Sequence, residues 1–357
     1  MHISISVVRM AKILFLVLAA IFTQSALAVI PTYERNILVN LYNSTNGAGW
    51  YLRDGWNGPA GSECNWYGVV CNTENTHVTG IGLVNNHLVG SLPSLAQVTY
   101  NGFFVFGLTY LQYFDVSYND LSGNIPEVFW LSNLRYFSVH HNHLTGTIPY
   151  TVEFLQNLET FYAQVNNLSG ELPELSWLSN LTNFNVSFNS LSGPMPEIAG
   201  LSHLRNFIVN NNWGIGGSLP SFAGLSALEV LNLSHNSFTG PIPELADLHS
   251  LTYFDASDNW LSGSIPSLSS LVNMWNFDAR FNALSGSIPS LTGLNSLSSF
   301  QVGHNQLTGV PPAAPERARY TIGGLWQLCP NHLIATYDPI WDRATGISPW
   351  YRDCYSK

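Results

Sequence analysis

The sequence has very little positive charge. Of its 357 residues, 12 are Lys or Arg and 22 are Asp or Glu, so the formal net charge is −10, and the only lysines are Lys12 and Lys357. A chain without a basic stripe has no surface that attracts the phosphate backbone of nucleic acid. An anionic membrane surface repels such a chain. We therefore expect no nucleic-acid partner and, once the N-terminal segment is removed, no membrane partner.

Long apolar runs are also missing, with one exception at the N-terminus. Residues 1–28 contain Arg9 and Lys12, then the apolar run ILFLVLAAIF, then Ala26-Leu27-Ala28. This order is typical of a signal peptide with a cleavage site after small residues. The run is too short for a comfortable transmembrane helix, and a retained membrane anchor is the alternative. We expect an exported protein that is secreted, periplasmic or held at the cell surface.

A repeat occupies most of the chain. The stretch from Leu108 to Pro126, LTYLQYFDVSYNDLSGNIP, recurs along the sequence, and Asn119 marks its phase. The successive spacings between equivalent asparagines are 33, 23, 24, 23, 23, 24, 23, 23 and 23 residues. A fixed period of this size predicts a solenoid. The other equivalent positions are Asn86, Asn142, Asn166, Asn189, Asn212, Asn236, Asn259, Asn282 and Asn305.

The repeat reads L-x-x-L-x-x-(F/L)-x-(V/L)-x-x-N-x-L-(S/T)-G-x-I-P, and it resembles the plant-type leucine-rich repeat from about Val78 to Pro312. The resemblance implies an α/β repeat solenoid, a curved right-handed superhelix of ten repeats with one parallel β-sheet on its concave face. The Asn, Gly and Pro of each repeat are then structural. The Asn bonds backbone groups at the turn, the Gly tolerates unusual backbone angles, and the Pro fixes an extended segment.

The resemblance divides the chain into a signal peptide (1–28), an N-terminal cap (29–77), the repeats (78–312) and a C-terminal cap (313–357). The motif Cys64-Asn-Trp-Tyr-Gly-Val-Val-Cys71 is similar to the N-terminal cap of plant-type repeat proteins. A cap must cover the apolar end of the first coil. We therefore expect Trp56 and Trp66 in the core rather than on a binding surface.

The first repeat spacing is ten residues too long, and alignment of the repeats places the insert at 98–107. Asn101-Gly102 lies there between two aromatic runs that favour strands, which predicts a hairpin. The hairpin either presents its rings to a partner or folds back onto the flank of the solenoid and buries them. The aromatic residues concerned are Tyr100, Phe103, Phe104 and Phe106.

Cysteine is scarce, with four residues that lie in two pairs near the ends of the repeats: Cys64, Cys71, Cys329 and Cys354. An even number in an exported chain favours disulfides. Three pairings exist, but the caps lie at opposite ends of a rod, so we expect Cys64–Cys71 and Cys329–Cys354. Zinc is the alternative, although this spacing is a poor zinc pattern without nearby ligands. We expect no metal and no cofactor.

Variable positions counted back from each asparagine give the candidate binding residues of the concave face. One group lies on the early repeats, where Tyr and His offer apolar area with a polar tip, as in binding hot spots; a solvated, unused face is the alternative. A second group is acidic, and its stacked Asp255 and Asp278 repel unless Arg280 or a calcium ion lies between them. The candidates are Tyr113, Asp115, Tyr118, Tyr136, His140 and Tyr162 in the first group, and Asp255, Asp258, Asp278 and Arg280 in the second.

The chain resembles polygalacturonase inhibitors and ectodomains of receptor-like proteins, including exported bacterial members. This resemblance implies non-catalytic recognition of a protein, peptide or glycan on the concave face. The alternative is a cell-surface adhesion module that binds polysaccharide or ice through its regular Ser/Thr/Asn face. A hydrolase built on Ser234, His235 and Asp258 is a weaker hypothesis, because no G-x-S-x-G motif supports it. The oligomeric state is left open.

Overall fold

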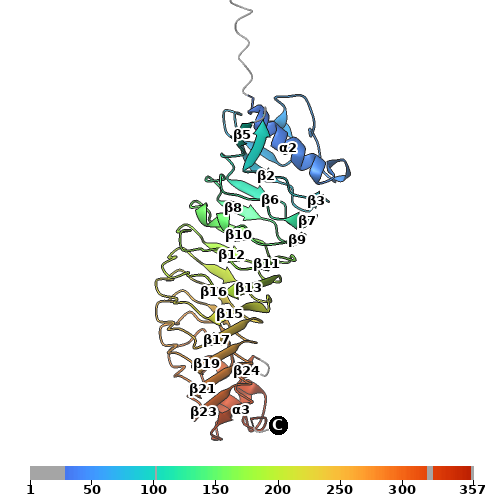
Figure 1. Cartoon of the computed structure of the whole chain (residues 1–357). Helices are drawn as coiled ribbons and strands as arrows, with labels where there is room; N and C mark the ends of the chain where they lie inside the picture. Colours follow the sequence, from blue (N-terminus) through green and yellow to red (C-terminus); the bar gives the residue numbers. More distant parts are fainter. Residues whose placement is uncertain (1–28, 101–102, 320–324, 355–357) are drawn as a thin grey trace, which may run out of the picture.

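The computed structural model describes residues 29–100, 103–319 and 325–354. The signal peptide expected at 1–28 lies outside these residues. The described chain forms an elongated, gently curved rod with the N-terminal cap at one end and the C-terminal cap at the other (Figure 1). Of the helices in these ranges, none is long and apolar enough to cross a membrane.

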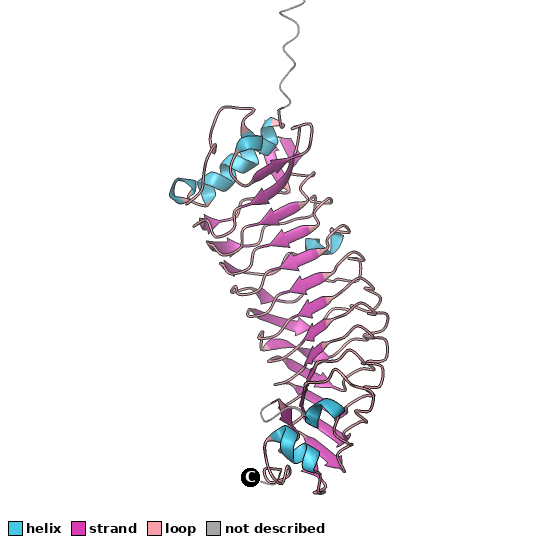
Figure 2. Ribbon diagram, turned by 180° about the vertical axis from the view of Figure 1, so that it is seen from behind, coloured by secondary structure: helices cyan, strands magenta, loops and turns pink. Residues whose placement is uncertain are grey.

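One short strand per coil builds the main sheet, which runs the length of the rod (Figure 2). Its strands pair in parallel, except for β1, which is antiparallel to β2. The ten strands between β1 and β24 each precede one of the ten repeated asparagines, as the period predicts. The strands in spatial order are β1 (Val69–Cys71), β2 (Val78–Gly82), β6 (Tyr113–Asp115), β8 (Tyr136–Ser138), β10 (Thr160–Tyr162), β12 (Asn183–Asn185), β14 (Asn206–Ile208), β16 (Val230–Asn232), β18 (Tyr253–Asp255), β20 (Asn276–Asp278), β22 (Ser299–Gln301) and β24 (Trp326–Gln327).

The core is a column of side chains from equivalent positions of successive coils. Phe114 and Val116 are fully buried, as the alternation along the strand predicts. The ring of Phe114 stacks on that of Phe137, with centroids 5.5 Å apart, and Phe137 stacks in turn on Phe161 at 5.4 Å. Each buried side chain of this size contributes about 1.5–3 kcal/mol to folding, so the apolar positions of the repeat are accounted for by stacking.

The repeated asparagines form the hydrogen-bond ladder that the sequence predicts. Asn119 is buried, and its Oδ1 accepts from the backbone N–H of Asn86 and of Leu88, each at 2.9 Å. Its Nδ2 donates to the carbonyl oxygens of Leu83 at 2.8 Å and Val116 at 3.0 Å. Nδ2 also donates to the carbonyl oxygen of Ser117 at 3.1 Å. One side chain thus pairs five backbone groups at the turn between two coils, which makes it structural rather than part of a site.

A second set of parallel strands follows the asparagine in each coil, which the repeat pattern alone does not predict. The S/T-G segment is extended there and pairs with its counterpart in the next coil; for example, Thr239 pairs with Trp260. The rod therefore has two sheet-bearing faces that meet at the asparagine turn. The strands are β3 (Val89–Ser91), β7 (Asp120–Asn124) and β9 (His143–Thr145) in one sheet, and β11 (Ser169–Gly170), β13 (Ser190–Pro194), β15 (Gly214–Ser218), β17 (Ser237–Gly240), β19 (Trp260–Ser264), β21 (Ala283–Ser287), β23 (Gln306–Gly309) and β25 (His332–Leu333) in the other.

The N-terminal cap consists of the helix α2 (Thr32–Ser44), two 3-10 turns (Gly47–Gly49 and Glu63–Asn65) and β1. The helix buries Ile37, Leu38 and Leu41. Trp56 and Trp66 are buried, as expected, and Cys64 and Cys71 form a disulfide. The cap thus covers the apolar end of the first coil with aromatic side chains.

The insert after the first coil forms the expected hairpin. Strand β4 (Gln97–Tyr100) pairs with β5 (Phe103–Phe106) in antiparallel fashion, with Gln97 opposite Phe106 and Thr99 opposite Phe104. The turn residues Asn101-Gly102 lie outside the described residues. The ring of Phe106 packs against Trp130 on the flank, with centroids 4.5 Å apart, yet Phe104 remains 79% exposed and Phe106 57% exposed. The hairpin therefore lies along the flank without burying these two rings.

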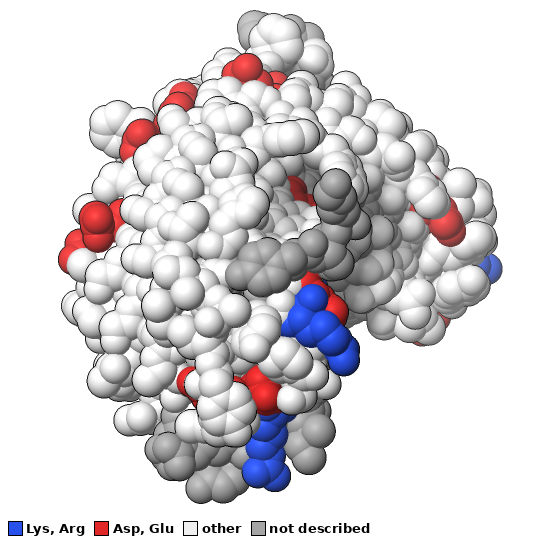
Figure 3. Space-filling model, turned by 90° about the horizontal axis from the view of Figure 1, so that it is seen from below, with Lys and Arg blue, Asp and Glu red and all other residues white. Residues whose placement is uncertain are grey.

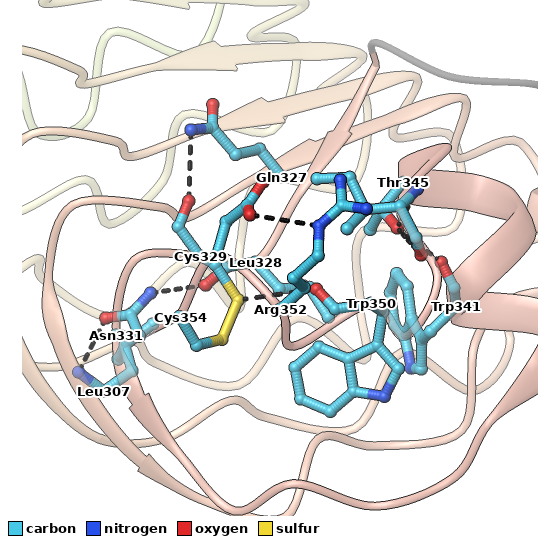
Figure 4. The surroundings of a disulfide bond; sticks show 12 residues. Leu307, Gln327, Leu328, Cys329, Asn331, Trp341, Thr345, Trp350, Arg352 and Cys354 are labelled. Atoms are coloured by element: carbon cyan, nitrogen blue, oxygen red, sulfur yellow. Dashed lines mark hydrogen bonds and ion pairs between the residues drawn. A yellow bond between two sulfur atoms is a disulfide. The ribbon is translucent and has the colours of Figure 1, made fainter. Parts of the chain in front are cut away.

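The solenoid continues one coil beyond Pro312, where the sequence pattern ends. Asn331 is buried; its Oδ1 accepts from Leu307 N–H at 2.9 Å, and its Nδ2 donates to the carbonyls of Val302 at 2.8 Å and Leu328 at 2.6 Å. Figure 4 shows Asn331 with its contacts to Leu307 and Leu328. These are the contacts of the repeated asparagines, so Asn331 is an eleventh rung of the ladder.

The remaining C-terminal residues close the rod. Trp326 of β24 pairs with Phe300 in parallel register, and its indole takes the core position that Phe occupies in other coils. A 3-10 turn (Glu316–Arg319) and the helix α3 (Pro339–Thr345) then cover this last coil. Cys329 and Cys354 form the second expected disulfide, next to the buried Trp350 (Figure 4).

Candidate binding surfaces

The aromatic candidates of the early repeats come together on the concave face. Tyr113 lies on β6, Tyr136 on β8 and Tyr162 on β10, which are neighbours in the main sheet. Tyr118 and His140 lie at the turns that follow β6 and β8. The strand register places the residues of adjacent coils one strand spacing apart, with β8 between β6 and β10. We call these five residues the concave aromatic cluster.

The rings of this cluster touch one another. Tyr113 stacks on Tyr136 with centroids 4.8 Å apart, and Tyr136 meets Tyr162 edge to face at 6.0 Å. Tyr118 contacts His140 edge to face at 4.9 Å, and His140 lies 6.2 Å from Tyr162. Tyr113 and Tyr118 are exposed and the others are half-buried. The result is a continuous aromatic surface with hydroxyl and imidazole groups on it.

Asp115 lies beneath this surface and not on it, which corrects the expectation that it points freely outward. Its side chain is on the concave side but only 6% exposed. Oδ2 accepts from the Tyr113 hydroxyl at 3.1 Å, and Oδ1 accepts from the backbone N–H and the hydroxyl of Ser117 at 3.0 and 2.6 Å. The carboxylate therefore holds the phenol of Tyr113 in place instead of meeting a partner itself.

Burial and charge shift the titration of this cluster. Burial, together with the Asp115 carboxylate, raises the pKa of Tyr113 to about 12. Burial also raises the pKa of Tyr136 and Tyr162. The pKa of His140 is lowered, mainly by burial and then by the neighbouring His141. At neutral pH the phenols of Tyr113, Tyr136 and Tyr162 and the imidazole of His140 are therefore neutral.

The acidic candidates of the later repeats divide into two places. Asp255 and Asp278 are paired in the register of β18 and β20, as expected. Arg280 neutralises Asp278: its Nε lies 3.0 Å from Oδ1 and its Nη2 2.8 Å from Oδ2. Asp258 instead lies at the turn, where its Oδ2 is 3.6 Å from Nδ1 of His235. Burial raises the pKa of Asp278, and the Arg280 guanidinium opposes that rise.

Asp255 repeats the arrangement seen at Asp115. The hydroxyl of Tyr253 donates to Oδ2 at 3.2 Å, and the N–H and hydroxyl of Ser257 donate to Oδ1 at 3.0 and 2.6 Å. Tyr253 therefore has the local contacts of Tyr113, but its strand neighbours are Val230 and Asn276 instead of aromatic residues.

Ser234, His235 and Asp258 do not form the hydrogen-bonded arrangement that a hydrolase needs. The Ser234 hydroxyl donates to Asn232 Oδ1 at 2.8 Å, so it is engaged with its own strand and not with His235. A nucleophile needs a base within hydrogen-bond reach. Within the described ranges, no group of three His, Cys, Asp or Glu side chains is placed to hold a metal ion.

A second aromatic surface lies on the flank, and only its hairpin part is predictable from the sequence. A cavity of about 610 Å³ lies between the hairpin and the segments around Trp130 and Tyr150. Phe129 contacts Trp130 at 4.5 Å and Phe154 at 4.9 Å, both edge to face. Tyr150 and Phe154 belong to a 3-10 turn (Tyr150–Phe154). These residues lie in the most variable part of the repeat, so no periodic signal marks them.

Charge is sparse on the surface as well as in the sequence. Figure 3 shows the molecule from its C-terminal end: uncharged residues cover most of this face, and the blue Arg side chains stand at a few points. A surface of this kind suits a partner recognised by shape, stacking and hydrogen bonds, because long-range charge steering needs a concentrated field.

Comparisons with known proteins agree with this fold. The leucine-rich repeat family model matches residues 110–131, 133–155 and 227–248. A comparison with curated proteins gives no significant match. A TDR receptor of known crystal structure has 31% sequence identity to this chain. The match covers 67% of this chain and 42% of that chain, with a TM-score of 0.59.

Two further solved structures are similar. The ectodomain of the Arabidopsis receptor kinase HAESA, in complex with an N-terminally extended IDA peptide hormone ligand, is 25% identical over 84% of this chain and 57% of that chain, with a TM-score of 0.53. A plant ice-binding protein is 22% identical over 80% of this chain and 98% of that chain, with a TM-score of 0.52, which shows the fold alone. The chain thus spans about half the length of the two receptor structures. With its ladder of repeated asparagines and the family match, the chain is a leucine-rich repeat protein whose repeats are of the plant type.

Proposed function

We propose that the protein is an exported, non-catalytic recognition module that binds a peptide or an extended protein segment across the concave aromatic cluster. The observation that carries the proposal is the contact of Tyr113, Tyr136 and Tyr162 on three adjacent strands. Stacked tyrosines supply rigid, amphipathic contact area, and such residues dominate the energy of many binding interfaces. A ligand that lies across the strands meets all three rings at once.

Two further features support a peptide partner. The HAESA ectodomain, which is similar to this chain, was solved with a peptide hormone ligand. The carboxylates of Asp255 and Asp278 lie further along the same concave face, on β18 and β20. Asp278 is buried and paired with Arg280, whereas Asp255 is only half-buried and has no cationic partner in its hydrogen bonds. A long ligand that reaches β18 meets the Asp255 carboxylate after the rings, which favours an extended chain with a basic group at one end. Disulfides at both ends of the rod suit an oxidising compartment outside the cytoplasm.

The test is selection of ligands from a random peptide library displayed on phage, using the chain from Val29 onward. The selected peptides are then measured against Tyr113→Ala/Tyr136→Ala. We expect this double variant to lose about tenfold or more in affinity, because two ring contacts of a hot spot are removed. Tyr253→Ala is the matched control, since it removes a tyrosine with the same Asp and Ser partners outside the cluster. Equal affinity for the double variant contradicts the proposal.

A regular array of hydroxyl groups favours the second candidate, an ice-binding or polysaccharide-binding adhesion module. Several of these hydroxyls donate to the glycine carbonyl of the preceding coil, for example Ser122 to Gly90 at 3.3 Å and Thr308 to Gly286 at 3.4 Å. Ser122, Ser169, Ser285 and Thr308 therefore share one orientation along the rod. The residues of the column are Ser122, Thr145, Ser169, Ser192, Thr239, Ser262, Ser285 and Thr308, and Gly216 interrupts it between Ser192 and Thr239.

The two candidates respond to different substitutions. On the adhesion hypothesis, Thr239→Tyr with Ser262→Tyr abolishes inhibition of ice recrystallisation and binding to insoluble polysaccharide, because two bulky rings break the flat array. The Tyr113→Ala/Tyr136→Ala variant then behaves as wild type. If the wild-type chain affects neither ice growth nor polysaccharide retention, the adhesion hypothesis fails.

A further inference from the structure

The edge between the two sheet-bearing faces carries a cleft that belongs to neither candidate surface. It has a volume of about 550 Å³ and lies over the coils from Asn212 to Asn305. Its walls include four aromatic or imidazole side chains and two polar ones. They are Trp213, Trp260, Phe281, His304, Asp258 and Gln306.

Trp213 is an inserted residue. In the neighbouring coils, the residue that directly follows the ladder asparagine starts the pairing with the preceding coil, as Trp260 does opposite Thr239. Here Gly214 takes that place opposite Ser192, so Trp213 is extra. It has a φ of 60° and is 66% exposed. Because the residue before each repeated asparagine also has a positive φ, this angle alone marks no site. The insertion and the exposure do: an exposed indole adds nothing to the core, which points to a role in binding.

Trp260 presents a second exposed indole. It is 71% exposed, and the equivalent residues of the two neighbouring coils are the small Ser237 and Ala283. No large side chain at these two positions covers either face of its ring. Phe281 and His304 form a further flat surface, with their rings stacked at 4.1 Å and inclined by 13°. The cleft therefore offers several separate ring faces along the axis of the rod.

The polar and charged groups restrict the ligand. No Lys or Arg is among the residues that line the cleft, so an anionic ligand has no counter-charge there. Asp258, Gln306 and Ser237 provide acceptors and donors beside the rings. This combination suits a neutral molecule with flat C–H faces and many hydroxyl groups.

A ligand in this cleft binds through the lining side chains and not by adding a strand to the sheet. Strands β17, β19 and β21 are each paired on both sides within the eight-stranded sheet that begins at β11. Strand addition needs a free edge.

We propose that this cleft is a binding site for a neutral oligosaccharide, whose sugar rings stack on Trp213 and Trp260 and whose hydroxyls bond to Asp258 and Gln306. The proposal is independent of the concave aromatic cluster.

The test measures intrinsic tryptophan fluorescence and binding heat during titration with soluble hexasaccharides of glucose, xylose and mannose. We expect saturable binding of at least one of them and none of a uronic-acid hexasaccharide. Deletion of Trp213 is the sharpest variant, because it changes the Asn212–Asn236 spacing from 24 to the commoner 23 residues. We expect this deletion to keep or raise the melting temperature and to weaken binding about tenfold or more, as Trp260→Ala does.

Trp177→Ala is the matched control, since Trp177 is an equally exposed indole that does not line the cleft. It keeps the wild-type affinity, and so does Tyr113→Ala/Tyr136→Ala. The proposal is overturned if no neutral hexasaccharide binds at millimolar concentration. It is also overturned if binding survives both the Trp213 deletion and Trp260→Ala, or if a proline-rich peptide binds the cleft while the sugars do not.

Discussion

The rings of Tyr113 and Tyr136 stack across two neighbouring strands, with centroids 4.8 Å apart and planes inclined by 16°. The hydroxyl of Tyr113 is held by the buried carboxylate of Asp115 at 3.1 Å. The first ring pair of the concave face is therefore fixed before any ligand arrives. A ligand that uses it loses little free energy in ordering these side chains.

The stack predicts an energetic coupling between its two rings. In a double-mutant cycle with Tyr113→Ala and Tyr136→Ala, we expect a coupling of about 0.5–1.5 kcal/mol in the free energy of unfolding. Urea denaturation of the four proteins measures it. The pair of Tyr113 and Tyr253 lies on distant strands and serves as the control, for which we expect additive effects. Additive effects in the stacked pair contradict the geometry.

The contact with Asp115 predicts the titration of Tyr113. Its pKa of about 12 arises from burial and from the Asp115 carboxylate. In Asp115→Asn the charge is gone while the burial remains, so we expect the pKa to fall toward, but not reach, the ordinary value of about 10. Because the folded-state pKa is raised, the associated stability is present below about pH 10 and is lost as the pH rises through 12. Carbon NMR of ring-labelled tyrosine measures the pKa of Tyr113 in both proteins. An unchanged pKa in Asp115→Asn argues against the contact.

The lowered pKa of His140 predicts that the folded protein loses stability on acidification. Its pKa is lowered in the folded state by burial and by His141. The folded protein therefore favours the neutral imidazole, so the associated stability is present above the ordinary pKa of about 6.5 and is lost as the pH falls through the lower folded-state value. Unfolding free energies of the wild type and His140→Gln, measured from pH 7.5 down to 5, should converge at the acidic end. Parallel pH profiles for the two proteins would speak against this account.

The ion pair of Arg280 with Asp278 predicts a destabilised variant that a second substitution rescues. Asp278 is buried and its carboxylate receives three close N–H contacts from the guanidinium. Since Arg280 itself is partly exposed, we expect Arg280→Ala to cost about 1.5–3 kcal/mol in unfolding free energy. Adding Asp278→Asn removes the uncompensated charge and should restore part of the loss. Thermal unfolding at pH 7 compares the three variants, and no rescue in the double variant counts against a buried charge as the cause.

Asn331 predicts that the last coil is stabilised like the others. Asn331→Ala leaves the N–H of Leu307 and the carbonyls of Val302 and Leu328 without this partner. Each buried group that loses its partner costs about 1–3 kcal/mol. Chemical denaturation should show a loss of this order or more, whereas the exposed Asn273→Ala should stay within about 0.5 kcal/mol of wild type. If Asn331→Ala leaves the free energy of unfolding unchanged, the ladder ends before this coil.

The fold was predictable from the sequence because its regularity is local. Each asparagine of the period marks one turn, so the strand that precedes it follows from counting. The hairpin follows from the residues 101–102 between aromatic runs, and the two disulfides follow from the position of the cysteines at the ends of a rod. None of these inferences required knowledge of which side chains meet across coils.

The features that the sequence did not predict depend on contacts between side chains of different coils or neighbouring positions. Alternation along β6 gives the direction of Asp115 but not the tyrosine that hydrogen-bonds to it, so its burial could not be foreseen. Asn331 follows Asn305 by 26 residues, and a Trp replaces the usual Phe of the strand, so the last coil lost the sequence pattern while its hydrogen bonds remained. The edge cleft depends on Trp213, whose exposure and backbone angle have no sequence signature beyond one extra residue.

The most direct test of the central claim is the affinity of a library-selected peptide for the wild-type chain, for Tyr113→Ala/Tyr136→Ala and for Tyr253→Ala, measured by calorimetry. Far-UV circular dichroism first confirms that all three are folded. We predict that the peptide binds the wild type and Tyr253→Ala alike and binds the double variant about tenfold or more weakly. Equal affinity for all three proteins would contradict the assignment of binding to the concave aromatic cluster.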